Sequence, residues 1–225
     1  MKFTAFLASM SLAAAVVAAA DLPVYSRIAK TKIEEIQERL AKAGGCNANI
    51  CFAIDGSGSM SKEEFTNQKN FVLDVASIVG VDEVAEFAAV QYSTANTAIT
   101  PLTVDSAHFI EKVLHSNQKK GKSFVTGGIN YCFSQLWRRP FDANKIVLLG
   151  DGKANVGSSA VRRADLFRKI GGVVAVVSAG KPDEDKLLKI AGGKFDHIFE
   201  VTNFFDVLGL QANVEDLVLD ICKEY

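Results

Sequence analysis

The chain has 225 residues, 48% of them hydrophobic, and its 25 basic residues nearly balance 26 acidic ones. A formal net charge of −1 lacks the basic excess of a nucleic-acid-binding protein, so we expect no nucleic-acid partner. The length is sufficient for one α/β domain with a buried core.

The first 20 residues have the pattern of a secretory signal peptide. Lys2 precedes an apolar run that ends in Ala18-Ala19-Ala20, and small residues of this kind are typical of a cleavage site. The run is short for a spanning helix, and charged residues interrupt every later apolar run, so we expect no membrane span. The sequence therefore predicts a secreted, extracellular protein.

Residues 21–45 predict an amphipathic helical extension before the domain. Four apolar residues recur at helical spacing, and two glycines follow them. The intervening glutamates disfavour binding to an anionic membrane, so we expect the helix to pack on the edge of the domain. The four apolar residues are Ile28, Ile33, Ile36 and Leu40.

Beyond residue 46, short apolar runs alternate with longer helical patterns. The runs are apolar throughout, as in strands buried on both faces, and the alternation implies a sheet covered by helices. We therefore expect a doubly wound α/β fold with a mostly parallel central sheet. The expected strands are 50–54, 86–91, 145–149, 173–178 and 198–201, with a weaker edge strand at 97–100. Helices are expected near 65–79, 109–114, 127–137, 158–170, 183–190 and 207–225.

Oxygen-bearing side chains follow two of these strands and fill one loop. In doubly wound sheets ligands bind at the carboxyl ends of the strands, near the topological switch point. The first strand runs into Asp55-Gly56-Ser57-Gly58-Ser59, and the strand at 145–149 runs into Gly150-Asp151-Gly152. A loop at 121–129 adds Ser and Thr hydroxyls. An all-oxygen set of this kind suits a hard cation such as Mg²⁺. The first motif alone is also an ordinary turn sequence, so the convergence of three loops carries the prediction.

These motifs, together with the order of the elements from about Cys46 to Cys222, resemble a von Willebrand factor A domain of the integrin inserted-domain type. The resemblance implies a metal-ion-dependent adhesion site that holds Mg²⁺ or Mn²⁺ and binds a carboxylate of a protein ligand. Serine hydroxyls would bind the metal directly, and both aspartates would act largely through waters. The implied metal residues are Asp55, Ser57, Ser59, Ser123 and Asp151, with Thr126 and Gly152 as supporting loop residues. Gly150 departs from the family, which usually has Thr or Ser before Asp-Gly.

No two of the four cysteines form a CxxC motif, and this absence argues against a zinc site. An oxidising compartment would favour disulfides. Related domains often join their two ends, so the resemblance implies a bond between Cys46 and Cys222. Cys51 and Cys132 are left as either a second pair or two buried thiols.

The predicted function is a non-enzymatic binding module, residues 46–225, for an acidic residue of a matrix, cell-surface or host protein. The alternatives are a Mg²⁺-dependent hydrolase, or a structural or carbohydrate-binding secreted protein. No nucleophile has an evident orienting partner. His108 and His115 fall in a helix pattern remote from the three loops in sequence, and His197 lies just before a short strand, so we expect surface or packing roles for all three. Gly121-Lys122-Ser123 lacks the earlier glycine of a phosphate-binding loop, because residue 116 is Ser, so we expect no nucleotide.

Overall fold

The computed structural model describes residues 30–80, 84–140, 143–151, 157–179, 183–201, 203–204 and 207–222. The predicted signal peptide, the first part of the 21–45 extension and Gly152 lie outside these ranges. A six-stranded sheet has the order β3-β2-β1-β4-β5-β6. Only the β2–β3 pair is antiparallel among these described strands, so the predicted α/β fold with a mostly parallel sheet is confirmed.

The elements lie close to their predicted positions. The strands are β1 (Asn49–Asp55), β2 (Glu86–Tyr92), β3 (Thr97–Thr103), β4 (Asn144–Gly150), β5 (Val173–Ala179) and β6 (Ile198–Val201). The helices are α1 (Lys30–Lys42), α2 (Lys62–Val79), α3 (Ser106–Leu114), α4 (Val125–Leu136), α5 (Ser158–Lys169), α6 (Glu184–Ile190) and α7 (Val207–Ile221), with a short 3-10 helix η4 (Phe195–His197).

Helices α2 and α3 each begin three residues earlier than predicted, and two further elements also differ from the sequence prediction. The edge strand β3 continues through Pro101 to Thr103, because an edge strand has an unpaired side on which the missing N–H of proline costs nothing. Its pairing with β2 contains register shifts. Helix α4 begins at Val125, two residues earlier than expected, which puts Thr126 in its first turn.

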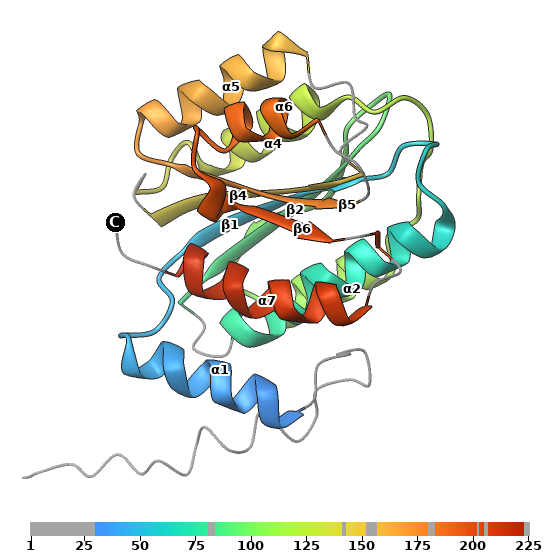
Figure 1. Ribbon diagram of the computed structural model, residues 1–225. Coiled ribbons are helices and arrows are strands. Elements are labelled where there is room, and N and C mark those ends of the chain that lie inside the picture. The colour runs from blue at the N-terminus through green and yellow to red at the C-terminus, as the bar shows by residue number, and fades with distance from the viewer. Residues whose placement is uncertain are drawn as a thin grey trace, which may run out of the picture.

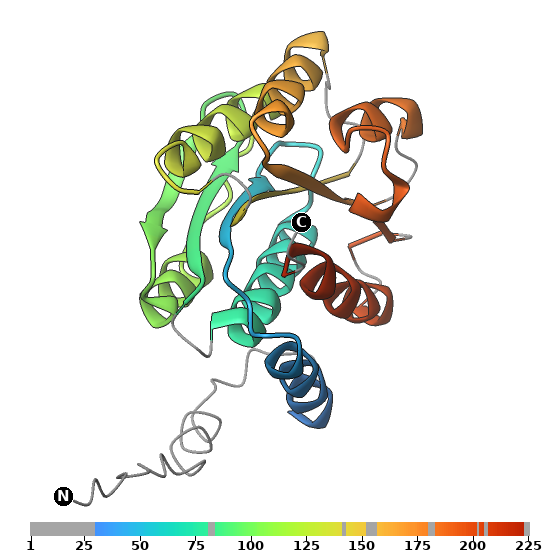
Figure 2. The same cartoon turned by 90° about the vertical axis from the view of Figure 1, so that its left-hand side faces the viewer.

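Helices cover both faces of the sheet (Figures 1 and 2). Along β1, Ile50, Phe52 and Ile54 pack into a core with α1, α2, α3 and α7. Cys51 and Ala53 point to the opposite core, which α4, α5 and α6 complete. All seven residues of β1 are therefore buried, and this two-sided burial explains why the run from Ile50 to Ile54 is apolar throughout.

Helix α1 lies against α7 at the margin of the domain (Figure 1). Ile33, Ile36 and Leu40 are buried in the core that α7 shares. On the outer side, Lys32 and Arg39 both form ion pairs with Glu215 of α7. The described part of the extension thus packs on the edge of the domain by its apolar side. Within the described ranges, no helix combines the length and apolar character needed to cross a membrane.

Two disulfides join distant parts of the chain. Cys46, after α1, is bonded to Cys222 at the end of α7, with an S–S distance of 2.03 Å. Cys51 of β1 is bonded to Cys132 of α4. The first pair is the expected one, and the second is one of the two alternatives left open above. None of the four cysteines is free.

Candidate metal centre

The three predicted loops meet where the sheet changes direction. The chain adds β2 and β3 on one side of β1, and β4, β5 and β6 on the other, so the topological switch point lies between β1 and β4 (Figure 1). These neighbouring strands are parallel, and their carboxyl ends carry Asp55 and Asp151. The strand order, which the sequence did not specify, therefore brings the two carboxylates to one edge.

Asp55 is fully buried and its backbone is held on both sides by one glutamine. Gln68 Oε1 accepts a hydrogen bond from the Asp55 N–H at 3.1 Å, and Gln68 Nε2 donates to the Asp55 carbonyl at 3.1 Å. The Ser57 N–H donates to Asp55 Oδ1 at 2.8 Å. Burial raises the pKa of Asp55 from its ordinary 3.8 to about 6, the hydrogen bonds from Ser57 oppose this rise, and the charge of Asp151 adds to it. A cation bound beside Asp55 and Asp151 would stabilise the ionised form of this buried carboxylate.

Three serine hydroxyls lie around this carboxylate. Ser57 Oγ and Ser59 Oγ are 2.9 Å apart, and Ser123 Oγ donates to Asp55 Oδ2 at 3.4 Å. Neighbouring ligands of an octahedral Mg²⁺ at about 2.1 Å are about 3.0 Å apart, so the spacing of the first two hydroxyls fits such an ion. Among the described residues, no three His, Cys, Asp or Glu side chains gather as a metal-binding group, so a cation here needs the hydroxyls as well as the acids.

Hydrogen bonds that the sequence did not reveal fix the serine loops. Gln118 Nε2 donates to the carbonyls of Ser57 at 3.0 Å and Met60 at 2.9 Å. The Gly58 N–H donates to the Gly121 carbonyl at 2.7 Å, which ties the first loop to the 121–129 loop. These contacts use backbone atoms and glutamines at no fixed spacing from the motifs, so no sequence signal could have identified them.

The remaining predicted site residues have different surroundings. Asp151 is 7% exposed and close enough to raise the pKa of Asp55 by its charge. Thr126 Oγ1 lies 2.9 Å from Ser159 Oγ at the start of α5, so its hydroxyl supports the loop from the other side. Gly152 is outside the described residues.

The histidines lie outside this site. His108 lies on α3 and His115 directly follows that helix, and both side chains are exposed. His197 is buried, and its Nδ1 lies 2.7 Å from Asp220 Oδ2, which links the segment before β6 to α7. This arrangement gives His197 a structural partner far from the three loops.

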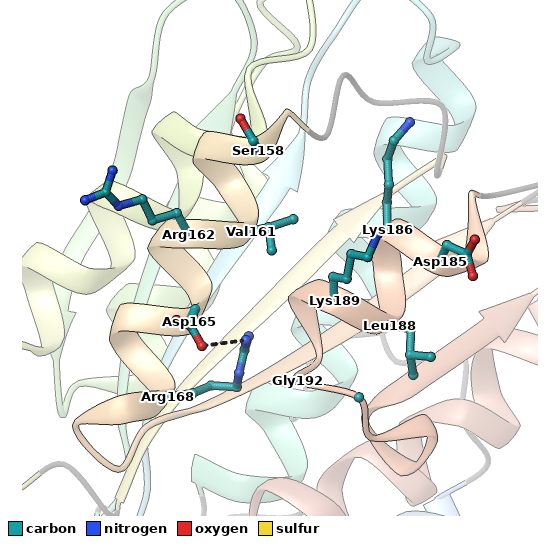
Figure 3. A pocket seen from close by; sticks show the side chains of 11 residues that line it. Ser158, Val161, Arg162, Asp165, Arg168, Asp185, Lys186, Leu188, Lys189 and Gly192 are labelled. Carbon is teal, nitrogen blue, oxygen red and sulfur yellow. Dashed lines mark ion pairs between the residues drawn. The ribbon is translucent and has the colours of Figure 1, made fainter.

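Two hollows in the surface differ in their chemistry. A hollow of about 530 Å³ is lined by Ser57, Ser59 and Ser123, and Thr94, Gly121, Lys122 and Phe124 complete its wall. A larger hollow of about 840 Å³ lies between α5 and α6 (Figure 3). There Asp165 forms an ion pair with Arg168, as the dashed line in Figure 3 shows, and the lining residue Lys186 forms an ion pair with Asp183 at 2.6 Å. The smaller hollow is the candidate metal centre, because its lining includes Ser123, whose hydroxyl donates to the buried Asp55 carboxylate.

Comparisons with known proteins agree with the fold. Residues 49–213 match the family model of the von Willebrand factor type A domain. The collagen alpha-6(VI) chain of Mus musculus is 31% identical over 189 residues, which cover 78% of this chain and 8% of that protein. Matrilin-2 of Mus musculus is 27% identical over 168 residues, which cover 69% of this chain and 17% of that protein. The chain thus spans less than a fifth of the length of these curated relatives.

Solved structures show the same architecture. One is the structure of proximal thread matrix protein 1 from the mussel byssus, with zinc in its MIDAS (metal-ion-dependent adhesion site) motif. It superposes with a TM-score of 0.68 and a sequence identity of 22%, over 77% of this chain and 46% of that chain. The pilus adhesin SpaC from Lactobacillus rhamnosus GG is 14% identical with a TM-score of 0.61, covering 79% of this chain and 30% of that chain. At these identities the likeness shows the fold.

Proposed function

Because the chain belongs to the von Willebrand factor type A domain family, we propose that it is a non-enzymatic adhesion module that captures a carboxylate of a protein ligand through a divalent cation. The observation that carries this proposal is the meeting of Asp55, three serine hydroxyls and Asp151 at the switch point of the sheet. The zinc-occupied MIDAS motif of the mussel byssus protein and the adhesin role named for SpaC support it.

The donor set explains why a ligand carboxylate would complete the site. Ser57, Ser59 and Ser123 would bind the cation through neutral oxygens, and Asp55 and Asp151 would hold its waters. A cation bound in this way keeps most of its positive charge and attracts an anionic oxygen of the ligand. The compact serine pair favours Mg²⁺ or Mn²⁺ over Ca²⁺, which takes six to eight ligands at longer distances.

The proposed location of the module is extracellular. The signal-peptide pattern of residues 1–20 and the two disulfides suit an oxidising compartment. Its relatives include collagen VI chains and matrilin-2. The proposed partner is therefore a matrix, cell-surface or host protein that presents a Glu or Asp side chain.

Calorimetric titration with Mg²⁺ tests the site directly. We expect Asp55→Ala and Asp151→Ala to lose Mg²⁺ binding while they retain the circular dichroism spectrum of the parent. Asp165→Ala is the matched control, because that carboxylate forms an ion pair with Arg168 on α5, outside the metal centre. Unchanged Mg²⁺ binding by both aspartate variants would refute the assignment.

A pull-down extends the test to function. Secreted and cell-surface proteins are captured on the immobilised parent protein in Mg²⁺, and the bound proteins are released with chelator. We expect the immobilised Asp55→Ala protein to capture none of the proteins that chelator releases from the parent. Release of the same proteins from both columns would show that the cation plays no part. Turnover of phosphodiester substrates in Mg²⁺, abolished in Asp55→Ala, would instead favour a hydrolase.

A further inference from the structure

The segment from His115 to Phe124 joins α3 to α4, and its last residues line the same hollow as Ser57 and Ser59. None of its residues, all of which the structure describes, belongs to a helix or strand. Connections of this kind are ordinarily the more mobile parts of a domain. Here a lysine of α2 holds the start of the segment, because Lys69 Nζ donates to the carbonyls of Leu114 at 2.8 Å and Ser116 at 2.9 Å.

Gln118 of this segment closes the first serine loop. Its Nε2 donates to the Ser57 carbonyl at 3.0 Å and to the Met60 carbonyl at 2.9 Å. The Met60 N–H also donates to the Ser57 carbonyl, at 3.3 Å. Ser59 lies between these two residues, and its hydroxyl is 2.9 Å from that of Ser57. The glutamine thus holds both ends of the turn that carries the two hydroxyls.

The next part of the segment ties the first serine loop to Thr94, which lies between β2 and β3. The Gly58 N–H donates to the Gly121 carbonyl at 2.7 Å, and the Lys122 N–H donates to Thr94 Oγ1 at 2.8 Å. The packing is close, because a Cβ at Gly121 would lie 2.4 Å from Thr94 Oγ1 and a Cβ at Gly58 would lie 3.3 Å from the Gly121 carbonyl oxygen. The Thr94 hydroxyl therefore fixes the backbone directly before Ser123.

The backbone of the segment reverses at Lys120 and Gly121. Their φ angles are 59° and 101°, and Lys120 is the one residue other than glycine with a positive φ in the described ranges. Its Cβ makes this left-handed conformation unfavourable. Such residues persist where their surroundings fix them, and ligand clamps are among the places where they occur. On one side of the reversal Gln118 holds the first serine loop, and on the other Ser123 Oγ donates to Asp55 Oδ2 at 3.4 Å.

We propose that the 115–124 segment, held by Lys69 and Thr94, keeps the serine hydroxyls at the spacing of a small cation and so makes the metal centre select Mg²⁺ or Mn²⁺ against Ca²⁺. Selection between Mg²⁺ and Ca²⁺ depends on the size and rigidity of a site, because Mg²⁺ needs near-octahedral oxygens at about 2.1 Å, whereas Ca²⁺ accepts more ligands at about 2.3–2.6 Å in a flexible geometry. Gln118 and Thr94 are the positioning residues. The inference rests on the proposed metal centre and adds to it the groups that set its cation specificity.

The relative affinities for Mg²⁺ and Ca²⁺ test this proposal. Each cation is measured by its displacement of Mn²⁺, which is followed by electron paramagnetic resonance. Gln118→Met keeps the length of the side chain but removes the donor, and Thr94→Val keeps the bulk but removes the hydroxyl. Each should weaken Mg²⁺ binding by about 10- to 100-fold, the usual effect of removing a group that orients a metal ligand. Ca²⁺ binding should change far less, because a looser site still suits the larger ion, so the ratio of the two affinities should fall by about tenfold or more.

Two controls separate a positioning role from a general loss of structure. Thr94→Ser retains the hydroxyl and should bind both cations like the parent. Gln135→Met removes a glutamine of α4 whose Oε1 accepts from the Leu102 N–H of β3 at 3.2 Å, outside the metal centre, and should change neither affinity. Thermal unfolding in chelator is recorded for every variant. Gln118→Met and Thr94→Val act on different loops, so either variant alone decides the outcome if the other does not fold.

The outcomes separate this inference from the proposed function. Equal losses of Mg²⁺ and Ca²⁺ affinity would overturn it, as would parent-like binding of Mg²⁺ by both positioning variants or a parent that prefers Ca²⁺. In each of these cases the metal centre still stands if Asp55→Ala abolishes Mn²⁺ binding. If Asp55→Ala binds Mn²⁺ like the parent, the proposed function itself fails.

Discussion

Replacement of Asp55 by Asn should make the metal-free domain more stable at neutral pH. Asn retains the oxygen that accepts from the Ser57 N–H at 2.8 Å, but it carries no charge into the buried site. The pKa of Asp55 is about 6 in the folded protein against an ordinary 3.8. A group whose pKa is raised on folding contributes stability below its unfolded pKa and loses that contribution as the pH rises through its folded pKa. The metal-free parent therefore loses stability between about pH 4 and pH 6.

The magnitude follows from the size of this shift. A difference of about two pKa units corresponds to about 3 kcal/mol, because each unit is about 1.4 kcal/mol. In chelator at pH 7.5, Asp55→Asn should exceed the parent by up to about 3 kcal/mol in the free energy of unfolding, and the two should converge near pH 4. Mg²⁺ at about 100 times its Kd should stabilise the parent by about 2.7 kcal/mol and leave the variant unchanged.

Urea unfolding followed by circular dichroism measures all of these values. The two proteins are compared in chelator at pH 4, pH 6 and pH 7.5, and again at pH 7.5 in Mg²⁺. The comparison isolates Asp55, because every other titrating group is common to both proteins. A variant less stable than the parent in chelator at pH 7.5, or a difference that does not depend on pH, would refute the argument that burial of this charge is costly.

Three further predictions concern other parts of the chain. Cys222→Ser opens the loop of 176 residues closed by Cys46, and should lower the free energy of unfolding by up to about 5 kcal/mol in the chain-entropy treatment; an unchanged urea midpoint would contradict it. Ser123→Val removes a hydroxyl from the metal centre and should weaken Mg²⁺ binding in calorimetry, whereas Ser123→Thr should retain it; the reverse order would move the metal-binding role to another loop residue, Thr126 first. Asp220→Ala leaves a buried histidine without its 2.7 Å partner and should cost about 1–3 kcal/mol in thermal or urea unfolding, with no change in Mg²⁺ affinity.

The sequence by itself determined the elements and the chemistry of the motifs. Two-sided burial favours apolar side chains at consecutive positions, so the apolar runs within β1, β4 and β5 could be recognised from composition alone. The apolar pattern predicted the start of α2 at residue 65, three residues late, although Ser61 and Glu64 form a local capping box that marks the true start at Lys62. Asp55-Gly56-Ser57-Gly58-Ser59 indicated a cation ligand set for the same reason: the donors are close together in the chain.

Only the tertiary structure decided which distant groups meet near the carboxyl ends of β1 and β4. Tyr92 and Leu149 are 57 positions apart, and their hydrogen bond exists because β2 and β4 flank β1. The close approach of residue 150 to the Tyr92 hydroxyl, which a Cβ at Gly150 would meet at 2.5 Å, comes from the same strand order and from no local turn. The disulfide between Cys51 and Cys132 depends in the same way on where α4 packs on the sheet. Periodicity and turn chemistry act over a few residues, whereas strand order and packing set the neighbours of a buried group, and a single sequence contains the first kind of information far more directly than the second.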